Sequence, residues 1–225
     1  MASHFERATK RLKEQIIKLG QEVELQLKHA IEALVEHDLE KAESVIKGDD
    51  VIDNLEVELE ENCLKLLALH QPVATDLRFV VAVLKINNDL ERIGDLSVSI
   101  SKRAKRLIEL QEKNLPEQIL QLADKAKLVL RQSLLALVEV DVEVARKVIE
   151  ADDEIDDLNR QVYQARIEEL KTAGDNAEVQ VLFLSSSKHF ERIGDLSSNI
   201  AEDVIYMMEG EIIRHGRYAS LWGES

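Results

Sequence analysis

The sequence predicts an all-helical protein made of two similar three-helix bundles in tandem, and three observations lead to this prediction. Only 2 of the 225 residues are proline and 8 are glycine, too few for the many turns of a β-rich fold. Aromatic residues make up 4% of the chain although 45% is hydrophobic, so aliphatic side chains must form the core, as they do where helices pack on helices. The third observation is an internal repeat, which predicts two copies of one unit.

The repeat is clearest in a run of seven identical residues. Glu91-Arg-Ile-Gly-Asp-Leu-Ser97 recurs 100 positions later as Glu191-Arg-Ile-Gly-Asp-Leu-Ser197 (191 − 91 = 100). Further upstream, Asp49-Asp-Val-Ile-Asp53 recurs 103 positions later as Asp152-Asp-Glu-Ile-Asp156 (152 − 49 = 103). The second copy is therefore three residues shorter between the two motifs, most naturally at the loop around Pro72. We expect one domain at residues 1–112 and a second, with a C-terminal tail, at 116–225.

Each copy divides into three expected helices. Their ranges are 4–37, 39–70, 75–110, 117–140, 142–172 and 176–210. Asp38 and Asp141 stand where the first helix of each copy gives way to the second, and aspartate is a good N-cap residue. Short links between helices favour neighbours that run up and down, so each copy should be a three-helix bundle.

Heptad spacing predicts which side chains face the core. In the third helix of each copy, apolar or small residues alternate at spacings of four and three, as in helices packed nearly antiparallel. Both third helices also begin apolar nearly all round, so we expect them to lie centrally. The seam residues are Phe79, Val83, Ile86, Leu90, Ile93, Ser97, Ile100, Ala104 and Leu107, then Val179, Phe183, Ser186, Phe190, Ile193, Ser197, Ile200, Val204 and Met207. Phe5, Leu12, Ile16, Leu19, Val23 and Ala30 form a similar seam in the first helix.

Composition disfavours several classes of function. The formal net charge of −15 repels phosphate backbones, so no nucleic acid is expected as a partner. Cys63 is the only cysteine, which suits a reducing compartment. There is no signal-peptide h-region and no apolar run near the ~20 residues of a membrane helix. We therefore expect a cytoplasmic protein without direct membrane insertion, peripheral to the inner face of the membrane through its partners.

A short basic cluster interrupts the acidic composition near the end of the third expected helix. It consists of Lys102, Arg103, Lys105 and Arg106. Cations at a helix C-terminus interact favourably with the helix dipole, which is the simplest interpretation. The alternative is a patch that binds a partner or an anion.

Acidic pairs four residues apart recur in both copies and are the candidate functional residues. They are Asp49 and Asp53, Glu91 and Asp95, Asp152 and Asp156, and Glu191 and Asp195. Residues at this spacing share a helix face, where like charges repel and a bound cation would remove the repulsion. By helical phase these pairs should face outward or line a shallow groove between the second and third helices. The duplication predicts two metal sites of four carboxylates, suited to a divalent metal or iron (iron, zinc, manganese or magnesium).

Other interpretations of the acidic pairs stay open. They could be a solvated face on a purely structural helical adaptor, since 32% of the chain is charged. They could also hold metals for phosphate-ester hydrolysis, although the motifs offer no obvious acid or base and no Gly-rich phosphate loop. His189, which replaces Asp89 in the second copy, is either an extra ligand or a solvated side chain. There is no Glu-x-x-His pair of the ferritin-like di-iron type. Gly94 and Gly194 sit mid-helix at a cost of about 1 kcal/mol each, which suggests the close approach of a neighbouring helix or a ligand.

The duplicated motifs resemble the E(D)xxxD motif pairs of the PhoU family. Pro72-Val-Ala-Thr-Asp-Leu-Arg78 is similar to the family's loop into its third helix. The family is also similar at Glu202-Asp-Val-Ile-Tyr-Met-Met-Glu-Gly210, which His215 follows. The resemblance covers essentially the whole chain. The second copy departs from it at His189 and has Ala173-Gly-Asp-Asn176 in place of the proline loop, so a role specific to that loop belongs to the first copy.

The resemblance implies a regulator of phosphate transport and not an enzyme. It implies negative regulation of phosphate uptake and of the phosphate-starvation response, by binding the ATPase PstB of the phosphate ABC transporter and the sensor kinase PhoR. It also implies a homodimer, and metal ions held by the eight acidic residues given above.

Overall fold

The computed structural model describes residues 4–172 and 174–210, and the regular secondary structure of these ranges is helical, without a strand. This agrees with the predicted fold class. The helices are α1 (His4–Glu36), α2 (Leu39–Lys47), α3 (Asp49–His70), α4 (Ala74–Glu109), α5 (Glu117–Glu139), α6 (Val142–Glu150), α7 (Asp152–Leu170) and α8 (Ala177–Glu209), with a 3₁₀ turn η1 (Gly174–Asn176) before α8. His215 and the rest of the tail at 211–225 lie outside the described residues.

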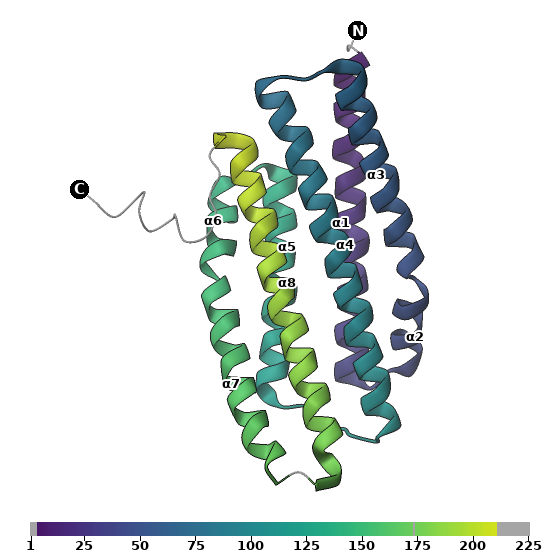
Figure 1. Cartoon of the computed structure of the whole chain (residues 1–225), viewed down its shortest axis with the longest axis vertical. Helices are drawn as coiled ribbons and strands as arrows, with labels where there is room; N and C mark the ends of the chain where they lie inside the picture. Colours follow the sequence, from purple (N-terminus) through teal and green to yellow (C-terminus); the bar gives the residue numbers. More distant parts are fainter. Residues whose placement is uncertain (1–3, 173, 211–225) are drawn as a thin grey trace, which may run out of the picture.

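The two halves pack side by side along their length. Figure 1 shows α1 to α4 forming one elongated bundle and α5 to α8 the other. Helices α4 and α8 contact each other and every other α-helix of their own halves, as their all-round apolar beginnings predict. The second contact between the halves joins α1 to α5. The predicted central position of the third helix of each copy is confirmed.

The second expected helix of each half is divided into two helices, α2 and α3 in the first half and α6 and α7 in the second. This corrects the continuous helices expected at 39–70 and 142–172. The N–H of Gly48 bonds back to Ser44 and Val45, and α3 then starts at Asp49. The same break occurs at Ala151, so glycine is not its only cause. Acidic residues crowd the first turn after each break, where they favour a helix N-terminus. The Asp-Asp pair that opens α3 and α7 is therefore a local signal for a new helix that periodicity alone misses.

The short helices α2 and α6, which precede α3 and α7, start where the sequence predicts. The carboxylate of Asp38 accepts a hydrogen bond from the backbone N–H of Lys41. The carboxylate of Asp141 accepts from the N–H groups of Glu143 and Val144. These bonds satisfy donors that have no partner inside the helix.

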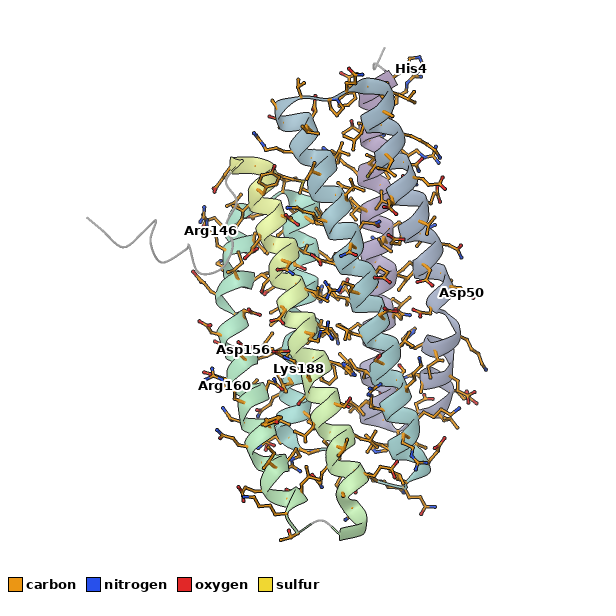
Figure 2. The ribbon with its side chains drawn as sticks, viewed as in Figure 1. His4, Asp50, Arg146, Asp156, Arg160 and Lys188 are labelled. Carbon is orange, nitrogen blue, oxygen red and sulfur yellow. The ribbon has the colours of Figure 1, made fainter. Side chains whose placement is uncertain are left out.

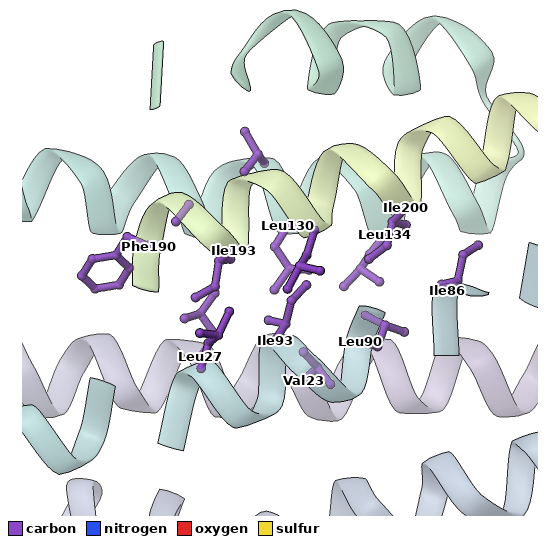
Figure 3. Close-up of a cluster of buried hydrophobic side chains, with 14 of the residues drawn as sticks. Val23, Leu27, Ile86, Leu90, Ile93, Leu130, Leu134, Phe190, Ile193 and Ile200 are labelled. Carbon is purple, nitrogen blue, oxygen red and sulfur yellow. The ribbon is translucent and has the colours of Figure 1, made fainter. Parts of the chain in front are cut away.

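The core runs between the two halves and uses the predicted seams. All of the predicted α8 seam residues are buried, and in α4 only Phe79 is partly exposed. Figure 3 shows Ile86, Leu90 and Ile93 facing side chains of the other half, including Leu130 and Ile193. Within the described residues, none of the helices is both long and apolar enough to cross a membrane.

The mid-helix glycines lie where a neighbouring helix comes closest. A Cβ on Gly194 would lie 2.9 Å from Cδ1 of Ile155 in α7, and one on Gly94 would lie 3.2 Å from Cδ1 of Ile52 in α3. A side chain at either glycine would crowd the isoleucine of the helix that carries the other acidic pair, so that the isoleucine would have to shift. Close approach of a helix, one of the two explanations expected from the sequence, is therefore what the structure supports.

We predict that Gly194→Ala destabilises the protein. Overpacking costs about 1–3 kcal/mol, and the better helix propensity of alanine returns about 1 kcal/mol, so the expected net loss is about 1 kcal/mol in urea unfolding. Adding Ile155→Val, which removes the nearest methyl group, should recover part of the loss. Asn199→Ala, at an exposed site of the same helix, is the control for propensity alone. Equal stability of Gly194→Ala and the native chain would contradict the close contact.

Candidate functional site

In the first half, α3 and α4 bring all four predicted carboxylates together. Burial raises the pKa of Asp49, and the charges of Asp53 and Asp95 raise it further. Burial also raises the pKa of Glu91, with added repulsion from Asp95, Asp53 and Asp49 among its neighbours. Four carboxylates from two helices therefore share one electrostatic environment, as the repeated spacing predicts.

In the second half, α7 and α8 form a tighter version of the same arrangement. One carboxylate oxygen from each of Asp156, Glu191 and Asp195 lies within 4.8 Å of the others, and among the described residues only this trio meets that test. Asp152 is the fourth carboxylate of this set. Burial raises its pKa to about 6, with added repulsion from the charges of Asp195 and Asp156, which shows that these carboxylates lie near it. Burial and the charges of Glu191 and Asp156 likewise raise the pKa of Asp195.

The second site is more enclosed than the expected outer groove. Glu191 is only 9% exposed, and Lys188, which replaces Asn88 of the first copy, lies against it with Nζ 2.5 Å from Oε1. Figure 2 shows Lys188 beside Asp156 between α7 and α8. Of the two predicted placements, the groove between the second and third helices describes Glu191 better than an outward-facing position does, whereas its pair mate Asp195 is exposed.

Two oxygens of the second site lack partners. Oδ1 of Asp152 and Oε2 of Glu191 are buried, and no donor among the described residues lies in hydrogen-bonding geometry to either atom, although Ser198 lies near enough to Asp152 to lower the pKa of that carboxyl. Burying carboxylate oxygens without partners is costly, and a bound cation would satisfy them. The second site therefore fits an oxygen-coordinated divalent ion, with Asp152, Asp156, Glu191 and Asp195 as the ligands. Coordination of iron, zinc, manganese or magnesium there stays a prediction.

The first site is larger and includes residues that the motif did not indicate. Glu56 lies close enough to Glu91 to raise its pKa, and its own pKa is raised by burial and then by Glu60. The amide nitrogen of Asn87 donates to the Glu56 backbone oxygen at 3.0 Å. Gln26 of α1 is buried, its side chain lies close enough to Asp49 to lower the pKa of that carboxyl through hydrogen bonding, and its Oε1 would lie 3.2 Å from a Cβ on Gly94.

These additions have no counterpart in the second half. The matching positions, 103 residues later, hold Asn159 for Glu56, Tyr163 for Glu60 and Val129 for Gln26 (159 − 56 = 103). The sequence did contain a signal for Gln26, because a glutamine between Val23 and Ala30 of an apolar seam indicates a polar group facing the core. The two sites are therefore related but not equivalent, with more acidic oxygens around the first.

His189 lies away from the carboxylates of its own half. It lines a pocket with Asp49 and Asp95 of the first half, and its Nε2 lies 3.4 Å from Oγ of Ser185. Burial, Arg103 and Arg192 lower the pKa of His189 to about 4, so its ring is neutral at pH 7. The alternative that His189 is an extra ligand of the second metal site gains no support from this position.

The basic cluster near the end of α4 divides into two pairs. Lys105 pairs with Glu43 at 2.9 Å, and Arg106 pairs with Glu178 at 2.6 Å. Arg103 instead donates to Oγ of Ser185, and Lys102 lines the same pocket as His189. Carboxylates therefore neutralise Lys105 and Arg106, whereas Lys102 lies beside the pocket and Arg103 bonds to uncharged oxygens.

Comparison with known proteins identifies one family along the whole chain. A family model described as the PhoU domain matches residues 16–104 and 119–204, once in each half. The chain is 38% identical over 203 residues to the "Phosphate-specific transport system accessory protein PhoU homolog" of Aquifex aeolicus, which covers 90% of this chain and 92% of that protein. It is 34% identical over 208 residues to the protein of the same name in Clostridium acetobutylicum, covering 92% of this chain and 95% of that one. The crystal structure of PhoU from Pseudomonas aeruginosa matches with a TM-score of 0.90 at 28% identity, over 92% of this chain and 100% of that one.

The raised pKa of Asp152 predicts a stability change with pH in the metal-free protein. The folded chain holds this proton up to a pKa of about 6, and the unfolded chain releases it near the ordinary aspartate pKa of 3.8. Between these values the folded state binds more protons, so the free energy of unfolding should fall as pH rises, and the cost is complete above pH ~6. Allowing for partial solvent screening, we expect a cost of about 1 kcal/mol.

Asp152→Asn should therefore be more stable than Asp153→Asn at pH 7.5 in EDTA by about 1 kcal/mol, and not at pH 4. Asp153 is exposed in the same first turn of α7, so both variants lose a similar interaction with the helix dipole. Urea unfolding at the two pH values measures the difference. A variant Asp152→Asn that is the less stable of the two at pH 7.5 would contradict the repulsion inferred here.

Proposed function

Because the chain belongs to the PhoU family, we propose that it is a negative regulator of phosphate uptake and of the phosphate-starvation response. The observation that supports this is the match of both halves to the family, together with relatives named as accessory proteins of the phosphate-specific transport system. The chain acts in the cytoplasm by binding PstB, the ATPase of the phosphate ABC transporter, and the sensor kinase PhoR. Its role is binding and not catalysis, and it works as a homodimer.

An exposed apolar tip is the surface that we assign to the transporter ATPase. Leu69 is 77% exposed and Val73 is 75% exposed at the end of α3 and in the loop before α4, and Leu77 is 40% exposed in the first turns of α4. Exposed aliphatic groups clustered at one end of a protein commonly mark a partner site. The tip belongs to the first half only, because the second half turns at η1 without the proline loop.

The two acidic sites are the metal sites of this regulator. Support comes from the four carboxylates gathered in each half and from the unpartnered oxygens of Asp152 and Glu191. A bound cation would remove the repulsion within each set and fix α3 against α4 and α7 against α8. Metal binding therefore stiffens the bundle rather than activating a reactant.

We predict that the double variant Leu69→Ser/Val73→Ser binds PstB about tenfold more weakly, as the loss of one apolar contact region would produce. Binding is measured by capturing the purified chain on immobilised PstB, with the PhoR cytoplasmic region as a parallel bait. The control is Leu64→Ser/Leu128→Ser, which changes two leucines that are each 53% exposed elsewhere. Absence of binding of the native chain to both baits, at any phosphate or metal level, would refute the regulatory proposal.

We also predict that metal raises the melting temperature of EDTA-treated protein. Ions that bind only the folded state stabilise it in proportion to the logarithm of their concentration above Kd. With manganese, iron or zinc, each site should contribute one part of this shift in melting temperature. The first part should be lost in Asp53→Asn/Asp95→Asn and the second in Asp156→Asn/Asp195→Asn. Asp50→Asn and Asp157→Asn, exposed on the same helices, should keep it in full. No shift with any of these ions would favour the structural adaptor.

A further inference from the structure

A polar pocket of about 340 Å³ lies between α4 and α8, at the boundary of the two halves. Arg92 and Lys102 line it from α4, and Arg192 and His189 line it from α8. Asp49 and Asp95 of the first acidic site form its other wall. The pocket therefore places three cations against two carboxylates in a chain whose net charge is −15.

The repeat explains why two arginines meet here. Arg92 and Arg192 occupy the same place in the duplicated motif. Helices α4 and α8 run antiparallel, since Lys85 near the start of α4 bonds Asp203 near the end of α8, and Arg103 bonds Ser185 near its start. The matching segments of the two copies thus cross, and both arginines reach one pocket.

Sequence differences between the two copies make the part of the α4–α8 contact around the pocket basic. Lys102, Arg103 and His189 have Glu202, Asp203 and Asp89 at the matching positions, 100 residues away. On the acidic side Asp203 is paired with Lys85 at 2.7 Å. On the basic side, the hydrogen bonds that Arg103 makes to described residues go to uncharged oxygens, Oγ of Ser185 and the backbone oxygen of Ser99, each at 2.9 Å. The duplication alone would not have produced this accumulation of positive charge.

Arginine and lysine in the pocket keep donors available. No hydrogen bond and no ion pair within 4 Å joins Arg92, Arg192 or Lys102 to another described residue, although Lys102 lies near enough to Asp49, and Arg192 near enough to Asp195, to lower the pKa of those carboxyls. A guanidinium group offers donors in a planar fork that matches phosphate oxygens, and two such groups can hold one tetrahedral anion from two sides.

His189 contributes a buried donor. Nε of Arg103 donates to Oγ of Ser185, which leaves the Ser185 hydroxyl proton free to reach Nε2 of His189 at 3.4 Å. A neutral ring that accepts at Nε2 carries its proton on Nδ1. Nδ1 is buried and has no partner among the described residues, a costly state for a donor that an anion would relieve.

We propose that this pocket binds a small phosphate-type oxyanion, held by Arg92, Arg192 and Lys102 and by the Nδ1–H of His189. The ligand is the tetrahedral phosphate group itself, either as inorganic phosphate or at the end of a small phosphate monoester. The proposal goes beyond the regulatory role, because it assigns this chain a ligand of its own, and it holds or fails with or without binding of PstB and PhoR.

The test is equilibrium dialysis of the EDTA-treated full chain against radiolabelled inorganic phosphate. Competition by glycerol phosphate separates a phosphate monoester from the free ion, and sulfate at the same ionic strength measures general anion attraction. We expect saturable binding of one phosphate per chain, weakened about tenfold or more by Arg192→Gln, by Lys102→Gln and by Arg92→Gln. His189→Phe, which keeps an aromatic ring but removes its N–H donor, should weaken binding without a change in the charge of the pocket.

Arg160→Gln is the matched control, since it removes one exposed arginine charge from α7, away from the pocket, and should leave binding unchanged. Urea unfolding of each variant checks that the fold persists, and full-length chain is used throughout. Absence of saturable binding by the native chain would overturn the proposal. So would binding that needs added manganese and survives the arginine and lysine substitutions, because the metal and not the pocket would then hold the anion.

Discussion

The contact between an isoleucine of one helix and a glycine of the next sets the geometry on which both acidic sites depend. Ile52 packs on Gly94 and Ile155 packs on Gly194 so closely that a Cβ at either glycine would crowd the isoleucine. Apolar packing thereby holds together carboxylates that repel one another. Repulsion within the acidic sets consequently lowers the stability of the metal-free protein, and packing of the core offsets this loss. The repulsion contributes to the raised pKa values of Asp49, Glu91, Asp152 and Asp195.

The two halves keep this contact but differ in what surrounds it. In the second half Lys188 compensates part of the charge and the carboxylates are tight and partly buried. In the first half Glu56 and Glu60 enlarge the acidic surroundings, and Gln26 adds a buried amide. Charges around the α4–α8 crossing diverge in the same way, basic on one side and acidic on the other. Duplication supplies the scaffold, and substitutions at matching positions give each half its own electrostatics.

Much of this arrangement can be predicted from the sequence, because it depends on periodicity and repetition. The heptad seams identify the buried faces of α4 and α8, and Asp38 and Asp141 mark helix starts through a bond between near neighbours. The repeated spacing also indicates that Asp49 and Asp53 face Glu91 and Asp95, whereas metal binding by them stays a prediction.

Other features depend on how distant segments meet, which a single sequence does not state. The breaks at Gly48 and Ala151 occur in backbone that is nearly helical, so only the acidic turn that follows indicates them. The burial of Glu191 depends on how closely α7 covers α8. The convergence of Arg92 and Arg192 needs the antiparallel register of α4 against α8, which long-range pairs such as Lys85 with Asp203 define.

Anomalous diffraction at the manganese edge from crystals soaked in manganese would test the central claim most directly, since it locates ions without reference to any activity. The account predicts anomalous peaks within coordination distance of the carboxylates between α7 and α8, and between α3 and α4. Crystals with ordered side chains at both places but no peak at either, or with peaks only at other surface carboxylates, would contradict it.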